Sequence, residues 1–315
     1  MSRALIVIAG PTGAGKSSLA LDIAAALGGE LVNCDSLQLY RGFDVGTAKT
    51  PLLERRQIPH RLLDVLDPAD GFSAGDYARR ARAAIAEIVA AGRLPIVAGG
   101  TGFYLRALLD GLPELPSRDP SIRERLQARE RNRPRSLHRL LTRLEPDAAR
   151  RIHSRDVQKT LRALEIRLLT GSRLPRPEPT GRLQGYTILK IGLNPDRTEL
   201  FTRLNARVES MFSGGLIEEV RGLLAHGATG DEKPFESLGY RQAIEHIRGK
   251  ITLEQAIVST QTATRQYAKR QWTWFRRDPE IHWLEGFGDQ PEVIRRALEL
   301  AGELAAKAKS PPVSG

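Results

Sequence analysis

Residues 4–17, Ala-Leu-Ile-Val-Ile-Ala-Gly-Pro-Thr-Gly-Ala-Gly-Lys-Ser, contain the stretch that decides the fold. Ala4–Ala9 is an uninterrupted apolar run, partly β-branched, as expected of a buried parallel strand. Gly10–Ser17 fits the phosphate-loop pattern G-x-x-x-x-G-K-[ST], and apolar side chains at helical spacing follow it as far as Gly28. Strand, glycine-rich loop and helix in this order predict a site where backbone N–H groups and a helix N-terminus bind phosphate.

Two further strands are predicted downstream, and each ends next to polar residues. Leu31–Asp35 ends in a carboxylate, and Leu94–Ala98 runs into Gly99-Gly100-Thr101-Gly102. A helix separates them, with Ser73 and Asp76 spaced as a capping box at its start. Alternating strands and helices predict an α/β fold with a P-loop NTPase-like parallel sheet flanked by helices. We therefore expect the phosphate loop, Asp35 and Thr101 at one edge of the sheet.

The remaining sequence divides the chain further. Arg-rich helical sequence broken by prolines predicts a small all-helical insertion, after which a strand at Thr187–Leu193 rejoins the sheet. The predicted parts are 1–112 for the first part of the core, 113–151 for the insertion, 152–293 for the rest of the core with basic helices, and 294–315 for a terminal helix and tail.

Composition excludes several classes of protein. With 315 residues, 41% hydrophobic and 27% charged, the chain can bury a real core and is not a disordered tail. One cysteine, Cys34, excludes an internal disulfide framework. A charged-then-apolar leader and a long apolar run are both missing from the sequence, so we expect a cytoplasmic protein without a membrane span. We also expect a monomer.

The net charge of +11 comes from two stretches. Between Ser117 and Arg151 there are 11 arginines against 5 acids, and between Gln261 and Arg277 there are 5 basic residues and no acid. Such local surpluses favour a surface that binds an extended anion such as RNA. Solvated basic helix faces are the alternative interpretation.

The phosphate loop alone does not identify the phosphate. Lys16 is placed to pair with a terminal phosphate, and the Ser17 hydroxyl can hold Mg²⁺. The strand Leu94–Ala98, however, lacks the terminal Asp that usually organises the metal in nucleotide hydrolysis. Asp35 is the carboxylate left at this edge, where it could accept a proton; a cap of the loop or helix is the alternative interpretation.

Three longer strings carry a family resemblance. They are Asp35-Ser-Leu-Gln-Leu-Tyr-Arg-Gly-Phe-Asp-Val-Gly-Thr-Ala-Lys49, Gly99-Gly-Thr-Gly-Phe-Tyr-Leu-Arg-Ala-Leu-Leu-Asp-Gly111 and Thr264-Arg-Gln-Tyr-Ala-Lys-Arg-Gln-Trp-Thr-Trp-Phe-Arg276. With Gly10-Pro-Thr12 they resemble the tRNA dimethylallyltransferase family, in order, from about residue 4 to residue 277. The resemblance implies transfer of a dimethylallyl group from dimethylallyl diphosphate to N6 of the adenosine just 3′ of a tRNA anticodon.

The resemblance also implies roles for residues. Asp35 resembles the general base, which accepts a proton from the weakly nucleophilic amine, and Thr101 resembles the hydroxyl that orients the reaction centre. Mg²⁺ at Ser17 would help to stabilise the leaving diphosphate. The residues that match the diphosphate site are Gly10, Pro11, Thr12, Gly13, Ala14, Gly15, Lys16, Ser17 and Arg207, although Arg207 could also be an ordinary surface arginine.

Further positions match contacts to tRNA in the family. The target base must be flipped out to react. By the resemblance, the residues that contact it are Asp35, Ser36, Leu37 and Gln38. A helix through Arg276 would place Arg265, Lys269, Trp272 and Arg276 on one face and Tyr267, Gln271 and Trp274 on another, so that one face can meet phosphates while the other packs or stacks. Trp274 and Phe275 could instead form core. The remaining predicted tRNA contacts are Gln158, Lys159, Thr160, Leu161, Arg162 and Arg270.

Three other functions stay open on the residues alone. A small-molecule or nucleotide kinase could use the same loop but would not need the two basic stretches. A prenyltransferase acting on free adenine nucleotides is disfavoured by the basic residues of 261–277. The third alternative is an RNA-binding module with a vestigial nucleotide site.

Overall fold

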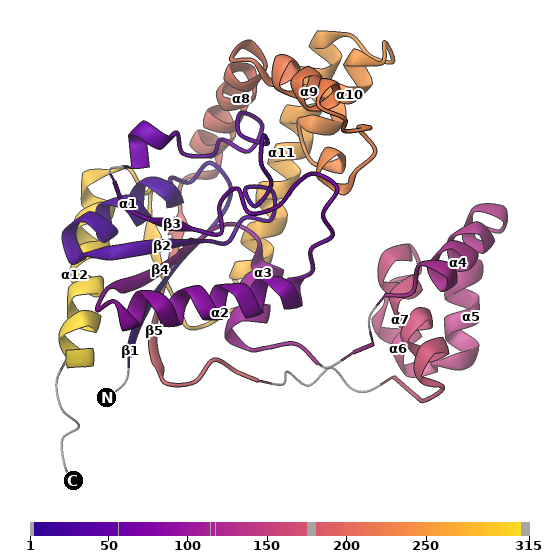
Figure 1. Cartoon of the computed structure of the whole chain (residues 1–315), viewed down its shortest axis with the longest axis horizontal. Helices are drawn as coiled ribbons and strands as arrows, with labels where there is room; N and C mark the ends of the chain where they lie inside the picture. Colours follow the sequence, from indigo (N-terminus) through magenta and orange to yellow (C-terminus); the bar gives the residue numbers. More distant parts are fainter. Residues whose placement is uncertain (1–2, 56, 114, 117, 175–180, 310–315) are drawn as a thin grey trace. The chain divides into compact units, whose positions relative to one another are not determined.

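The computed structural model describes residues 3–55, 57–113, 115–116, 118–174 and 181–309. The chain forms two compact units, one of Met1–Leu109 with Leu183–Gly315 and one of Asp110–Arg182 (Figure 1). The two ends of the first unit at the insertion point are hydrogen-bonded to each other: the N–H of Leu183 donates to the carbonyl of Leu109 at 2.8 Å.

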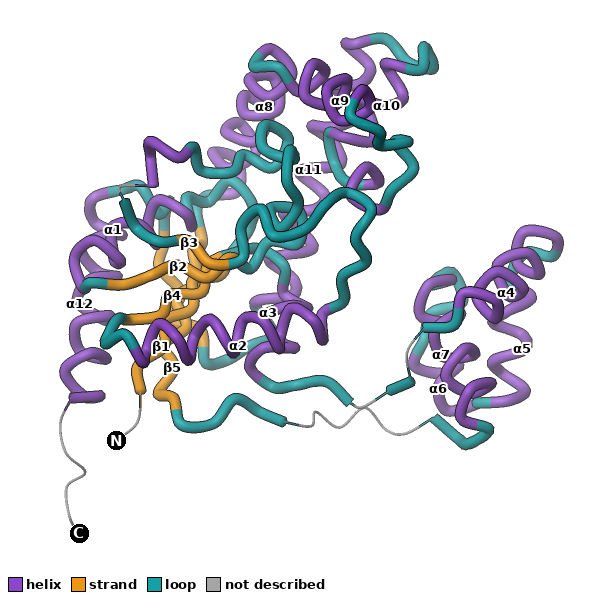
Figure 2. Tube along the Cα trace, viewed as in Figure 1, coloured by secondary structure: helices purple, strands orange, loops and turns teal. Residues whose placement is uncertain are grey.

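A single parallel sheet forms the centre of the first unit (Figure 2). The apolar run of the first strand lies in the middle, where Ile6 is in register with Ile96 on one side and with Leu189 on the other. Parallel strands buried on both faces read as continuous apolar runs, which explains this sequence. The strands are β1 (Arg3–Ala9), β2 (Gly29–Asn33), β3 (His60–Arg61), β4 (Leu94–Ala98), β5 (Tyr186–Asn194) and β6 (Ile281–Glu285).

The strand order is β3-β2-β4-β1-β5-β6. After β1 the chain crosses toward β2, and after the neighbouring β4 it crosses toward β5, so the two connections leave in opposite directions. Ligands in open parallel sheets bind outside the carboxyl ends of strands at such a switch. The phosphate loop and the Gly99–Gly102 turn both lie at this point, and the expectation of one shared edge is confirmed.

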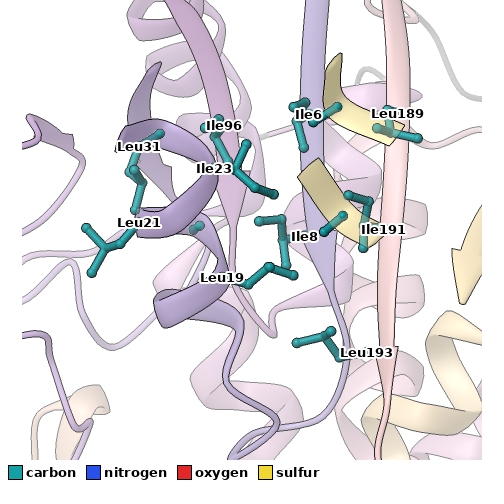
Figure 3. Packing of buried hydrophobic residues seen from close by; sticks show 14 of the residues in the cluster. Ile6, Ile8, Leu19, Leu21, Ile23, Leu31, Ile96, Leu189, Ile191 and Leu193 are labelled. Carbon is teal, nitrogen blue, oxygen red and sulfur yellow. The ribbon is translucent and has the colours of Figure 1, made fainter. Parts of the chain in front are cut away.

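Helices α1 (Lys16–Leu27) and α12 (Pro291–Lys309) cover one face of the sheet. Side chains alternate along β1, and Ile6 and Ile8 point into this face together with Leu19 and Ile23 of α1 (Figure 3). The predicted terminal helix is therefore part of the core, since Ala297 and other α12 side chains are buried here. The end of the predicted tail, 310–315, lies outside the described residues.

The other face of the sheet is covered by α2 (Ala74–Ala90) and α3 (Gly102–Leu109). Ser73 and Asp76 form the predicted capping box, with the Ser73 hydroxyl accepting from the Asp76 N–H at 3.1 Å. Tyr77, Ile85 and Ile88 form the fully buried stripe of α2. Helices thus close both faces of the sheet.

A helical layer lies beyond the carboxyl edge of the sheet, with its own core around Phe43, Phe235 and Tyr240. The chain that follows β2 contributes Leu39, Phe43 and Leu66 to this core. Its elements are α8 (Arg197–Ser213), α9 (Leu216–Ala225), α10 (Tyr240–Ile247), α11 (Leu253–Phe275) and the short 3₁₀ helix η2 (Lys233–Glu236). Another short 3₁₀ helix, η1 (Leu52–Arg55), lies between β2 and β3 and has no buried residue.

The second unit is all-helical, as predicted, but it is longer than predicted. The expected insertion, 113–151, stops before α7, whereas the compact unit runs from Asp110 to Arg182. Leu161 and Leu164 of α7 pack with Leu137 and Leu141 in the core of this unit. An insertion that ended at residue 151 would lack these core residues. Its helices are α4 (Pro120–Asn132), α5 (Ser136–Leu144), α6 (Pro146–Arg151) and α7 (Val157–Thr170).

Two strands were not predicted from the sequence. β3 has only two residues, and β6 carries the mixed sequence Ile-His-Trp-Leu-Glu at the edge of the sheet. An edge strand is paired on one side only, so its sequence does not have the continuous apolar run of a central strand. Among the described residues, no helix combines the length and the apolar character that crossing a membrane requires.

Candidate active site

Three glycines of the phosphate loop have a positive φ, the first being Gly10 (φ +134°). Gly13 (φ +79°) and Gly15 (φ +87°) adopt left-handed backbone conformations, and Gly15 is the N-cap of α1. A Cβ on Gly13 would lie 2.7 Å from Leu204 Cδ2, and one on Gly15 would lie 2.9 Å from the backbone nitrogen of Gly288. The loop is thus packed against α8 and the 286–289 segment while the N-terminus of α1 faces the edge of the sheet.

Lys16 is the cation of this loop. Its side chain is half-buried, and its Nζ donates to the carbonyl of Pro11 at 2.7 Å. Burial lowers the pKa of the Lys16 ammonium to about 8, and the nearby Asp35 carboxylate opposes this shift. A cation already stripped of part of its hydration interacts more strongly with an incoming anion than a solvated one does.

Asp35 follows β2 and is held by its own neighbourhood. The side-chain amide of Asn33 donates to the Asp35 carbonyl at 3.0 Å and accepts from the Asp35 N–H at 2.9 Å. The Asp35 Oδ1 atom accepts from the N–H of Leu37 at 2.9 Å. Asp35 therefore caps its own loop through Oδ1, and of the described residues none donates a hydrogen bond to its Oδ2.

Thr101 lies against the Asp35 segment. Its Oγ1 accepts from the N–H of Ser36 at 3.1 Å, and its own N–H donates to the carbonyl of Cys34 at 3.1 Å. The approach requires glycine at position 99, because a Cβ there would lie 2.2 Å from the Cys34 carbonyl carbon. The structure thus brings together Asp35 and Thr101, the two residues that the resemblance implies as catalytic.

Two cavities adjoin at this site. One of about 450 Å³ lies over the phosphate loop, and one of about 290 Å³ lies between the 35–47 segment and the helical layer. The walls of the second are mostly apolar or uncharged, with Leu204, Val208 and Met211 of α8 facing Tyr267 of α11. The residues that line both cavities are Thr12, Asp35, Thr47 and Arg207.

Arg207 of α8 is a half-buried residue of the site rather than an ordinary surface arginine. Its Nη2 donates to the Thr47 carbonyl at 3.3 Å. Burial lowers the pKa of the guanidinium, and Asp35 opposes the shift; arginine nevertheless stays charged in proteins. Arg203, one turn earlier, lines the phosphate-loop cavity and pairs with Asp289. It belongs to no motif that would have identified it from the sequence.

Similarity to known proteins identifies the family of this chain. The model of the IPP transferase family matches residues 38–278. A tRNA dimethylallyltransferase of Solibacter usitatus (strain Ellin6076) is 58% identical over 297 residues, covering 94% of this chain and 97% of the relative. The chain belongs to the IPP transferase family. A second tRNA dimethylallyltransferase, of Koribacter versatilis (strain Ellin345), is 50% identical over 300 residues, covering 94% of this chain and 97% of the relative.

Solved structures agree with this family and with the predicted fold class. The tRNA isopentenylpyrophosphate transferase of Bacillus halodurans has a TM-score of 0.71 and 34% identity, covering 98% of this chain and 97% of that one. A eukaryotic dimethylallyltransferase described as acting on tRNA has a TM-score of 0.82 and 27% identity, covering 97% of this chain and 80% of that one. The family resemblance read from the sequence is confirmed.

The predicted contacts to the flipped base lie where the two cavities adjoin. Ser36 and Leu37 line the smaller cavity, and Gln38 lines the larger. The Gln38 Nε2 atom donates to the carbonyl of Thr47 at 3.2 Å, which fixes the turn over the site.

The basic helix of this IPP transferase is α11, and only part of its predicted face is exposed. Lys269, Arg270 and Arg276 are exposed, whereas Arg265 is half-buried and donates to Asn205 Oδ1 at 2.5 Å. Trp272, predicted on the phosphate-facing side, is 8% exposed and packs with Leu200, Leu204 and Phe287. Trp272 nevertheless lines a cavity together with Lys269 and Arg276, so the predicted shared face is confirmed although most of the indole is buried.

Two residues of α11 belong to the site and were not predicted as site residues. Tyr267 lines the smaller cavity, and burial raises the pKa of its phenol, which keeps it neutral. Gln271, one turn later, is 4% exposed and contacts both the phosphate loop and the Gly99–Gly102 turn. Helical spacing places the two on one face, but the sequence does not show which face meets the sheet.

The predicted tRNA contacts at 158–162 lie on α7 of the second unit. Gln158 and Lys159 are exposed, and Lys159 pairs with Asp156 at 2.7 Å. Thr160 and Leu161 are buried at 1% and 0% exposure, so their side chains support the helix instead of contacting RNA in this structure. Arg162 donates to Glu165 at 2.8 Å and to the Pro116 carbonyl at 2.6 Å.

A metal ion would find few protein ligands here. Within the described residues, no group of three or more His, Cys, Asp or Glu side chains could hold one. The exposed Ser17 hydroxyl, in the first turn of α1, lines the phosphate-loop cavity with Asp35. Magnesium ions are commonly held by one or two protein oxygens together with substrate phosphates, and this donor set fits such an ion.

Proposed function

We propose that this IPP transferase transfers a dimethylallyl group from dimethylallyl diphosphate to N6 of the adenosine on the 3′ side of a tRNA anticodon, with release of diphosphate. One observation carries the proposal. Asp35 lines both the cavity over the phosphate loop and the adjoining cavity, so one carboxylate faces the places for a donor and for an acceptor. The named relatives, which are tRNA dimethylallyltransferases, support it.

The donor diphosphate binds over the phosphate loop. The N-terminus of α1, the ammonium of Lys16 and the guanidinium of Arg207 converge on one cavity. Their charges stabilise the diphosphate as it departs, which is the main electrostatic task when an allylic carbon–oxygen bond breaks. The N–H groups of Thr12 and Ala14 are donated to Gln271 and to the Pro11 carbonyl, so we assign the backbone contacts to the amides of residue 13 and residues 15–17.

Mg²⁺ is the metal that we propose for this site. Ser17 would hold it together with oxygens of the diphosphate, and when bound it would neutralise part of the charge on the leaving group.

The acceptor enters from the smaller cavity. As the C1–O bond of the donor breaks, its electron pair leaves with diphosphate, and the lone pair of N6 forms the new bond to C1. The amine then carries a proton in excess, which Asp35 accepts. Thr101 keeps the Ser36 backbone in place beside that carboxylate through the 3.1 Å hydrogen bond to Oγ1.

Transfer RNA is recognised mainly by its phosphates. Lys269, Arg270 and Arg276 of α11 are exposed on the first unit, and we assign them to the RNA backbone. In the second unit, we assign Gln158, Lys159 and the exposed arginines to the RNA as well. Since tRNA is modified in the cytoplasm of bacteria, we propose that compartment for the enzyme, acting as a monomer.

The test is transfer to RNA. The purified chain, dimethylallyl diphosphate, Mg²⁺ and an anticodon stem-loop are incubated, and the RNA is digested and analysed by mass spectrometry. We expect one adenosine to carry a dimethylallyl group in place of a hydrogen. Equal transfer to AMP would identify a free-nucleotide prenyltransferase, and phosphate transfer from labelled ATP would identify a kinase; either result contradicts the proposal.

A further inference from the structure

Gln271 joins two loops that are far apart in the sequence. Its Oε1 accepts from the N–H of Thr12 at 2.7 Å, and its Nε2 donates to the carbonyl of Gly100 at 2.8 Å. The side chain is 4% exposed, so neither hydrogen bond competes with bulk water. The amide has only one orientation that satisfies both partners, because a backbone N–H only donates and a carbonyl only accepts.

The two loops have different tasks in the proposed reaction. Thr12 belongs to the phosphate loop that binds the donor, and Gly100 precedes Thr101, whose hydroxyl holds the backbone beside Asp35. A single amide therefore spans the donor side and the acceptor side of the site. The chain also leaves room for it, since a Cβ on Gly100 would lie 2.1 Å from Gln271 Nε2.

Resting on the proposed function, we infer that Gln271 is a positioning residue that sets the distance between the leaving diphosphate and the acceptor-side carboxylate. Transfer needs the donor carbon and N6 aligned at near-contact distance, and a misplacement of about 1 Å can lower a rate by about 100-fold. Donor affinity depends on other groups, chiefly Lys16 and Arg207, which do not bond to Gln271 in the structure.

The first test is Gln271→Leu, which removes both hydrogen bonds at similar volume. We expect the single-turnover rate at saturating donor and RNA to fall by about 30-fold or more, with both dissociation constants changed by less than about threefold. Gln255→Leu is the matched control: it removes one hydrogen bond, to the Thr252 N–H, at the start of the same helix. Its melting temperature should fall while its single-turnover rate stays that of the wild type.

The second test keeps the shape and changes one hydrogen bond. In Gln271→Glu the carboxylate still accepts from Thr12 but repels the Gly100 carbonyl until it is protonated. A buried carboxyl next to a carbonyl has a raised pKa, so the ratio of variant rate to wild-type rate should rise as pH falls from about 8.5 to about 6.5. A merely structural defect would give a ratio that does not depend on pH.

The outcomes separate the two proposals. A wild-type chain without transfer refutes the proposed function. If the wild-type chain transfers the group and Gln271→Leu keeps the same rate at saturation, the positioning role is refuted and the proposed function stands. The same conclusion follows if Gln271→Leu loses only donor affinity. Should Gln271→Leu fail to fold, Gln271→Glu decides: a ratio that rises at low pH supports positioning, and a ratio that stays constant overturns it.

Discussion

The two units of this IPP transferase hold their positive charge in different ways. In the second unit, ten of the eleven arginines between 117 and 151 are exposed, and Arg162 is held by the buried carboxylate of Glu165. In the first unit, Lys16 and Arg207 are half-buried at a cavity, and Asp35 is the acid that acts on the pKa of both. Exposed charge attracts a long polyanion without regard to its details, whereas partly desolvated charge can recognise one small anion.

The largest effect on turnover is expected from removing the Asp35 carboxylate of the first unit. Asp35→Ala should lower turnover by about two orders of magnitude or more, because N6 loses its proton acceptor, while tRNA affinity changes little. Single-turnover kinetics and RNA titration measure the two quantities. Asp67→Asn, an exposed carboxylate paired with Arg41, is the control and should leave turnover unchanged. Near-normal turnover of Asp35→Ala would remove this residue from the mechanism.

The partly desolvated lysine should give donor binding a pH dependence that the exposed arginines cannot give. With the Lys16 pKa lowered to about 8, the free enzyme loses this positive charge above that pH. Donor affinity should then fall about tenfold per pH unit until it reaches the level of Lys16→Ala, which we expect to be about 10- to 100-fold weaker.

The same shift has a consequence for stability with the opposite sign. Between about pH 8 and the ordinary lysine pKa, the unfolded chain binds more protons than the folded one, so Lys16 makes the free energy of unfolding rise with pH. The pH dependence of donor affinity is measured by isothermal titration of the donor from about pH 7 to about pH 9.5. A flat profile in the wild type would contradict the assignment of the cation.

In the second unit, a paired arginine should affect stability instead of binding. Arg162→Ala removes one of two cations from Glu165, whose side chain is fully buried, and the loss should cost about 1–3 kcal/mol of that unit's stability. Hydrogen exchange along α7 measures it. Arg131→Ala, an exposed arginine of α4, is the matched control and should stay within about 0.5 kcal/mol. Equal effects of both variants would erase the distinction between the two kinds of arginine.

The smallest effect is expected on the exposed surface of the first unit. Lys269→Ala or Arg270→Ala should weaken tRNA binding and reduce the slope of log affinity against log salt by about one counterion each. Filter binding over a range of salt concentrations measures the slope. Lys307→Ala on α12 is equally exposed and should leave the slope unchanged; a comparable change there would show that net charge alone governs binding.

The sequence predicted those parts of the site that each lie within a continuous motif at the end of a strand. The phosphate loop, Asp35 at the end of β2 and Thr101 after β4 follow from strand ends that share an edge. The insertion boundary and β6 were missed for a common reason. Each depends on which surface a helix or strand buries against a distant partner, and local periodicity reports amphipathic character without naming the partner.

The sequence by itself determined the α/β class, the anion-binding loop and the family, because glycine spacing, apolar runs and long motifs are local properties of the chain. Only the tertiary structure decided that α11 reaches the site, that Gln271 spans Thr12 and Gly100, and that Arg207 borders both cavities. Those contacts join residues separated by more than 150 positions, and folding alone brings them within hydrogen-bond distance.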